Sequence, residues 1–102
     1  MKSAESKLHI VARITPKPEC YAEGLSAIRE ILAPTWKEAG CIQFDVFEDR
    51  ENGEYVLIEI FESEAALQFH YQQTYTKQVF ELYERILDKP PAVSRLVPVE
   101  PA

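Results

Sequence analysis

Two cysteines and only short apolar runs occur in this chain of 102 residues. Cys20 and Cys41 are too few and too far apart for a metal knuckle or a CxxC motif, so we expect two free thiols. The longest apolar runs, such as residues 56–58, fall far short of the about 20 residues that span a bilayer. The sequence therefore predicts neither a disulfide framework nor a transmembrane helix.

Positive charge is also scarce, because 11 Lys and Arg face 17 Asp and Glu and leave a net charge of −6. Without a Lys/Arg cluster, the chain lacks the surface that nucleic acids and anionic membranes require, and we expect neither as a partner. Residues 1–7 are polar and lack the apolar middle of a secretory signal, which favours a cytoplasmic location.

Sequence motifs for cofactors and nucleophiles are missing as well. There is no GxGxxG, Walker loop, HExxH, nucleophile elbow or catalytic-triad spacing. We therefore expect no cofactor and no metal, and any chemistry has to come from side chains around a pocket.

The chain does hold enough apolar material for one core, since 46% of its residues are hydrophobic. About 100 residues bury roughly two thirds of the surface of the unfolded chain, so the fold needs no disulfide or structural metal to be stable. We expect one domain over residues 8–99, with a polar tail at residues 1–7 and a short tail at residues 100–102.

Hydrophobic periodicity predicts four strands and three helices. The predicted strands cover residues 8–14, 41–48, 55–61 and 92–99, and the predicted helices begin near residues 19, 64 and 76. Pro34 is expected to break the first helix or bend its last turn, and Gly40 to supply a positive φ. Asn52-Gly53 favours a hairpin turn with positive φ at both positions, and Ser63 is a helix N-cap.

This βαββαβ order predicts a ferredoxin-like α+β fold, a four-stranded antiparallel sheet with its helices on one face. The second and third strands are apolar at both parities, whereas a face open to water should carry polar residues. We therefore predict that the helix-free face packs against a second copy in a symmetric homodimer.

Several motifs resemble the antibiotic biosynthesis monooxygenase family, over residues 8–97. They are Ile10-Val11-Ala12-Arg13-Ile14 with Lys17-Pro18, Leu32-Ala33-Pro34-Thr35 with Gly40-Cys41, Val56-Leu57-Ile58-Glu59, and Glu64-Ala65-Ala66-Leu67 before His70. The resemblance implies a dimeric α+β barrel, and in several members an oxidation of aromatic polyketides by molecular oxygen without metal or flavin. Other members degrade haem, isomerise small carbonyl compounds or have no assigned reaction.

Two departures from the family pattern affect this expectation. Phe61 stands where many members have a Trp, which keeps an apolar wall and loses an indole donor. The haem-degrading branch has a His in the third helix, and residues 76–87 contain none. We therefore set haem degradation aside. Tyr75 stands where relatives often carry a second His, and it remains able to act as a donor or acid.

Residues suited to cofactor-independent oxygenation are a base, hydrogen-bond donors and apolar walls. His70 shares a helix face with Leu67, and a lone His on such a face is more often structural than functional. The resemblance to the family makes a functional role about as frequent an expectation as a structural one. The predicted catalytic residues are His70, Glu59 and Tyr75, and the predicted substrate-binding residues are Phe61, Tyr71, Phe80, Tyr83, His9 and Arg13.

Glu59 interrupts an apolar strand with the parity of Leu57 and Phe61. A buried carboxylate must be partnered or have a raised pKa. If it points at the helices it is a base or a partner of His70, and if it points at the dimer interface it is structural. Arg13 is expected to pair with Glu59 across the sheet or to orient an anionic substrate.

The sequence thus predicts a homodimeric monooxygenase acting on a small aromatic or quinol-like substrate. Two alternatives stay open at this stage, an isomerase of a small keto compound and a non-catalytic dimeric ligand-binding or stress protein.

Overall fold

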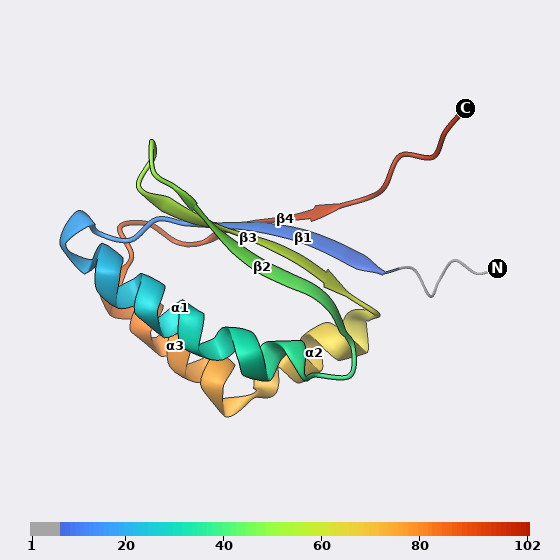
Figure 1. Cartoon of the computed structure of the whole chain (residues 1–102), viewed down its shortest axis with the longest axis horizontal. Coiled ribbons are helices and arrows are strands. Elements are labelled where there is room, and N and C mark those ends of the chain that lie inside the picture. The colour runs from blue at the N-terminus through green and yellow to red at the C-terminus, as the bar shows by residue number, and fades with distance from the viewer. Residues whose placement is uncertain (1–6) are drawn as a thin grey trace.

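One antiparallel sheet with the strand order β2-β3-β1-β4 forms the core of the computed structural model, which describes residues 7–102. The strands are β1 (Leu8–Ile14), β2 (Cys41–Asp49), β3 (Glu54–Phe61) and β4 (Ala92–Leu96), and the helices are α1 (Tyr21–Trp36), α2 (Glu64–Gln72) and α3 (Thr74–Ile86). All three helices lie on the same face of the sheet (Figure 1). The ferredoxin-like prediction is confirmed. The predicted tail at residues 1–7 lies, except for Lys7, outside the described residues.

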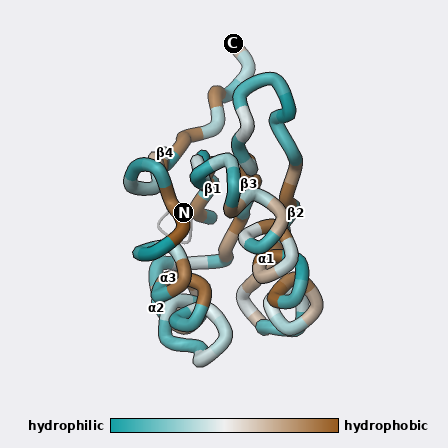
Figure 2. The backbone as a smooth tube through the Cα atoms, turned by 90° about the vertical axis from the view of Figure 1, so that its left-hand side faces the viewer, coloured by the Kyte–Doolittle hydropathy of each residue, from teal (hydrophilic) through white to brown (hydrophobic). Residues whose placement is uncertain are grey.

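The main core lies between the sheet and the helices. Strand β1 pairs with β3 in a register that sets Ile10 opposite Glu59 and Ala12 opposite Leu57, so alternate residues of both strands face the helices. Seen from the side, α1 and α3 run next to each other beneath the sheet (Figure 2). Ile28 of α1 is fully buried in this layer.

Helix α1 continues past Pro34 and ends at Trp36, so the proline does not break it. Proline lacks the N–H for one helical hydrogen bond and crowds the preceding turn, but its fixed φ is close to the helical value. The Pro34 carbonyl still accepts a hydrogen bond from the Lys37 N–H at 3.2 Å. The proline therefore lies within the last turn of an intact helix.

The two glycine predictions have different outcomes. Gly53 has φ 68° and turns the β2–β3 hairpin as expected, but Asn52 does not share the positive φ. Asn52 instead bonds to Asp49 through its own N–H at 3.3 Å and through its side chain at 2.9 Å. The positive φ predicted for Gly40 is wrong: a Cβ there would lie 2.3 Å from the Cβ of Ala66, so close approach to α2 requires the glycine.

The remaining boundaries agree with the sequence to within a few residues. Ser63 caps α2 and accepts a hydrogen bond from the Ala66 N–H at 3.1 Å, as predicted. Strand β4 ends at Leu96 and not at Val99. Within residues 7–102, no helix is long and apolar enough to cross a membrane. The cytoplasmic location stays a prediction.

The helix-free face is apolar along its centre. Val11 of β1 stands opposite Ile58 of β3, with Val56 and Ile60 on the same face of β3. These four side chains are partly exposed, and Phe47 of β2, opposite Val56, is 55% exposed. We refer to Val11, Phe47, Val56, Ile58 and Ile60 as the bare-face cluster.

Candidate functional site

A small cavity of about 70 Å³ lies between the helices and the sheet. Its walls are mainly apolar, and a carboxyl group and an imidazole line it, Glu59 from β3 and His70 from α2. The sequence analysis left the direction of Glu59 open. In the structure Glu59 points toward the helices and lines the same cavity as His70. It therefore lies on the face of the sheet opposite to the bare-face cluster.

Glu59 is 7% exposed and makes no hydrogen bond or ion pair with the residues that the structure describes. Its strand neighbours explain the burial, because it lies between Ile10 of β1 and Phe44 of β2 in the centre of the sheet. Loss of solvation disfavours the charged form and raises the pKa of the carboxyl to about 7. At neutral pH such a group exchanges protons in either direction.

His70 is 3% exposed and packs among aromatic rings. Its ring centroid lies 5.3 Å from that of Phe44, 5.2 Å from Phe61 and 5.9 Å from Tyr71. Nδ1 lies 2.9 Å from Oε2 of Glu38, a residue in the turn between α1 and β2. The ring is therefore held by packing on its faces and by a carboxyl group on one edge.

Tyr75 does not line the cavity. Its hydroxyl donates to Oε2 of Glu38, and burial together with this contact raises the pKa of the phenol. The predicted catalytic trio is thus divided: His70 and Glu59 share the cavity, and Tyr75 reaches His70 only through Glu38.

Three of the predicted substrate-binding aromatics line the cavity in a row, Tyr71, Phe80 and Tyr83. Adjacent rings lie 5.7 and 6.0 Å apart, and Phe80, the middle ring, is 43% exposed. Phe80 and Tyr83 also line an open groove of about 470 Å³ along the end of α3. Phe61 stands behind His70 and does not itself line the cavity.

Two residues were missed by the sequence reasoning, Glu38 and Thr76. Glu38 follows a helix and precedes a glycine, a place where a charged residue is ordinarily solvated, and no spacing signal marks it. Thr76, in the first turn of α3, lines the cavity and is 2% exposed, and its hydroxyl has no hydrogen-bond partner among residues 7–102. The cavity therefore offers a buried, unpartnered hydroxyl beside Glu59 and His70.

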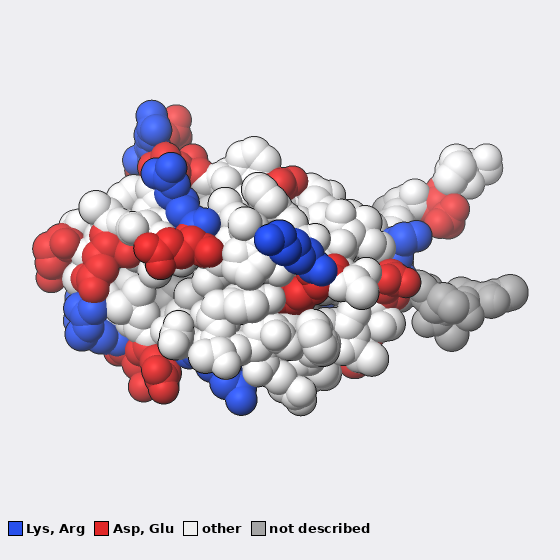
Figure 3. Space-filling model, turned by 60° about the horizontal axis from the view of Figure 1, so that its bottom comes forward, with Lys and Arg blue, Asp and Glu red and all other residues white. Residues whose placement is uncertain are grey.

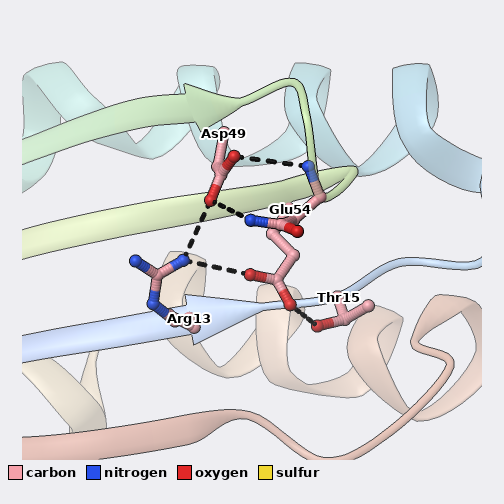
Figure 4. A network of polar contacts seen from close by, with 5 residues as sticks. Arg13, Thr15, Asp49 and Glu54 are labelled. Carbon is pink, nitrogen blue, oxygen red and sulfur yellow. Dashed lines mark hydrogen bonds and ion pairs between the residues drawn. The ribbon is translucent and has the colours of Figure 1, made fainter.

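His9 and Arg13 lie on the opposite face of the sheet and do not line the cavity. The predicted pair of Arg13 with Glu59 is wrong. Glu59 stands opposite Ile10 and faces the helices, whereas Arg13 stands three positions further along β1 and faces the other side, because side chains alternate between the two faces of a strand. Arg13 instead contacts Asp49 and Glu54, each at 3.1 Å, and Glu54 accepts a hydrogen bond from Thr15 (Figure 4). This network ties together the ends of three strands.

Charge on the helical side offers little to a polyanion. Acidic side chains gather toward the end where α1 begins, and the basic ones in view stand apart from one another (Figure 3). In the described part of the chain, no group of three or more His, Cys, Asp or Glu side chains is placed to hold a metal ion.

Known proteins share this architecture. A family model described as "Antibiotic biosynthesis monooxygenase" matches residues 7–82. The Mycobacterium tuberculosis protein named "Putative monooxygenase Rv0793" is 33% identical over 101 residues, 95% of this chain and 96% of that protein. Its solved structure matches with a TM-score of 0.87 at 29% identity, over 95% of this chain and 99% of that one. The structure of PA3566 from Pseudomonas aeruginosa matches with a TM-score of 0.87 at 25% identity, over 97% and 100% of the two chains.

The fold and the site together define a ferredoxin-like α+β protein with a small apolar cavity under its helices, lined by a buried carboxyl and an imidazole. The chain belongs to the antibiotic biosynthesis monooxygenase family, and this confirms the resemblance seen in the sequence. The family model and the Mycobacterium tuberculosis relative are both named for monooxygenase activity.

Proposed function

We propose that this protein is a cofactor-independent monooxygenase that oxidises a small phenol or quinol. The observation that carries the proposal is that one apolar cavity is lined both by His70 and by Glu59, a buried carboxyl without a hydrogen-bond partner among residues 7–102. An electron-rich phenol needs a base to form its anion, and the carboxylate of Glu59 is the group suited to take that proton.

The proposed reaction needs no external reductant. A ring carbon that bears a hydrogen, ortho or para to the phenol oxygen, loses that hydrogen and gains one atom of O₂, and the second oxygen atom leaves as water with the two hydrogens removed from the substrate. The product is a quinone from a phenol and a hydroxyquinone from a quinol. The substrate supplies all four electrons. Glu59 removes the phenol proton, and His70 is placed to accept the proton that leaves the ring carbon. The Thr76 hydroxyl is placed to donate a hydrogen bond to an oxygen atom as negative charge develops on it.

The size of the cavity limits the substrate. A cavity that holds benzene is about 150 Å³, and ordinary ligand sites run from about 300 Å³ upward, so about 70 Å³ cannot enclose a bicyclic ring. We propose that the reacting edge of a single ring enters between Tyr71 and Phe80 and that the rest lies in the outer groove. Polycyclic quinols are expected to react more slowly.

Oxygen uptake with a panel of single-ring phenols and quinols tests the proposal. The rate should rise as the pH passes through about 7, because ionised Glu59 is the base. Glu59→Gln should lower kcat by about 10²- to 10⁴-fold. The matched control is Glu62→Gln, which alters an exposed carboxylate just beyond β3. Uptake that never exceeds background, or that is equal in Glu59→Gln, would overturn the assignment.

The small cavity also favours a second candidate, the isomerisation of a small keto compound. A substrate of three or four carbon atoms fits a space of this size without any opening of the walls. Glu59 and His70 would then move a proton between the carbon beside the carbonyl and the carbonyl oxygen. Turnover that continues at the same rate without oxygen identifies this reaction. Binding without turnover of either kind identifies the ligand-binding alternative.

A further inference from the structure

Glu38 holds one edge of His70 from outside the cavity. The two side chains are each 4% exposed, and Nδ1 of His70 lies 2.9 Å from Oε2 of Glu38. The residues belong to different elements, α2 and the turn after α1, and 32 positions separate them in the sequence. Glu38 does not line the cavity, whereas His70 does. The contact therefore lies on the side of the ring away from the proposed substrate.

The hydroxyl of Tyr75 indicates which group donates in this contact. It lies 3.3 Å from the carbonyl oxygen of Pro34 and closer to Oε2 of Glu38. A phenol has one proton, and the shorter contact receives it, so Oε2 acts as an acceptor toward Tyr75. A carboxylate oxygen readily accepts two such bonds. The second donor is then the Nδ1–H of His70.

Glu38 carries a cost that packing alone does not explain. Its Oε1 is buried and has no hydrogen-bond partner among residues 7–102. A buried carboxylate oxygen without a partner destabilises the folded state, and an apolar side chain of similar volume would avoid that cost. A role in the orientation of His70 accounts for a carboxylate at this position.

We propose that Glu38 is a positioning residue that fixes His70 in the Nδ1–H form and leaves the Nε2 lone pair free in the cavity. In a neutral imidazole one nitrogen carries the proton and the other accepts. Nε2 makes no hydrogen bond with residues 7–102. The inference deepens the proposed function, on which it rests for the use of Nε2 by a substrate.

Nitrogen NMR of histidine-labelled protein tests the inference without any substrate. The chain has two histidines, so the variant His9→Gln assigns the resonances of His70. In neutral His70 we expect a protonated-type signal for Nδ1 and an unprotonated-type signal for Nε2. In Glu38→Leu the ratio of the Nδ1–H to the Nε2–H form should fall by about tenfold or more, because a charge-assisted hydrogen bond is lost.

Two further variants separate positioning from a purely structural role. Tyr75→Phe removes the other donor to Glu38 and should leave His70 in the Nδ1–H form. Glu38→Gln keeps the shape and should lower kcat for the oxygenation more than it raises KM. If Glu38→Leu does not fold, the wild-type and Glu38→Gln spectra still show which nitrogen of His70 carries the proton.

Opposite results would count against the inference in distinct ways. An Nε2–H form in the wild-type protein, or an unchanged ratio in both Glu38 variants, overturns it even if oxygen uptake still depends on Glu59. An absence of oxygen uptake with an intact Nδ1–H signal overturns the proposed function alone.

Discussion

At the scale of single residues, the ionisation of buried Glu59 links the proposed function to the stability of the fold. A carboxyl whose pKa rises from 4.5 to about 7 on folding holds its proton more tightly in the folded state than in the unfolded one. The contribution of Glu59 to stability is therefore greatest below pH 4.5, falls as the pH rises between the two values, and levels off above about 7. At about 1.4 kcal/mol per pH unit, ionised Glu59 costs the fold up to about 3 kcal/mol.

The variant Glu59→Gln should consequently stabilise the protein in alkaline solution while abolishing activity. Glutamine resembles the protonated acid, so urea unfolding should give a gain of about 3 kcal/mol at pH 8 and less than about 1 kcal/mol at pH 4.5. Glu62→Gln, the exposed control, should change stability equally at both pH values. An equal gain in stability for Glu59→Gln at both pH values would contradict a buried carboxyl with a raised pKa.

At the residue scale the sequence predicted two residues of the cavity, Glu59 and His70, and missed the partner of His70, Glu38. Alternation along β3 predicted the parity of Glu59, and the helix face predicted that His70 is buried, because both depend on local periodicity. Glu38 escaped because its partners, His70 and Tyr75, come from elements that follow it by more than 30 positions. Contacts of that kind depend on how helices pack and leave no local pattern.

At the scale of elements, the approach of the β2 entry turn to α2 depends on Gly40. A Cβ at this position would lie 2.3 Å from the Cβ of Ala66, and neither group can rotate away. Gly40→Ala should destabilise the fold by about 1–3 kcal/mol because the turn or the helix must shift. Ala66→Gly restores the space, so the double variant should lose less stability than the sum of the two single variants.

A double-mutant cycle by urea unfolding measures that coupling. Gly53→Ala supplies the matched control: its Cβ would have no neighbour within 4 Å, and its cost comes from φ 68° alone. Ala66→Gly should therefore not reduce that cost. Strictly additive effects for Gly40 and Ala66 would show that the close approach has no energetic consequence.

Elements themselves were largely predictable, and their junctions were not. Periods of two and of three to four residues located the strands and helices, because burial on one face imposes those periods. The positive φ expected for Gly40 and Asn52 was wrong, and Pro34 did not break its helix. Gly40 is explained by its close approach to Ala66 of α2, and Asn52 by its hydrogen bonds to Asp49. Neither contact leaves a period in the sequence.

At the scale of the whole molecule, the bare-face cluster stays without a partner in the single chain. The sheet is covered by helices on the other side only, as Figure 1 shows. An apolar surface along the centre of an antiparallel sheet is unfavourable in water, and burial against an identical surface removes it without a second protein. We propose that two chains pack through this face about a twofold axis.

Light scattering after size exclusion tests the dimer. The wild-type protein should have twice the chain mass of 11.7 kDa at micromolar concentration. Ile58→Arg puts a charge at the centre of the bare-face cluster, next to Val11 on β1, and should yield folded monomers because Ile58 is only partly buried in the single chain.

The matched control is Phe69→Arg, which places the same charge on a side chain that is 53% exposed on α2, on the helical side. This variant should remain dimeric. A monomeric wild-type protein, or dimers that dissociate equally in both variants, would show that the bare-face cluster is not the dimer interface. The cavity lies on the helical side of the sheet, so a folded Ile58→Arg monomer should also retain the Nδ1–H signal of His70, and this separates assembly from the integrity of the site.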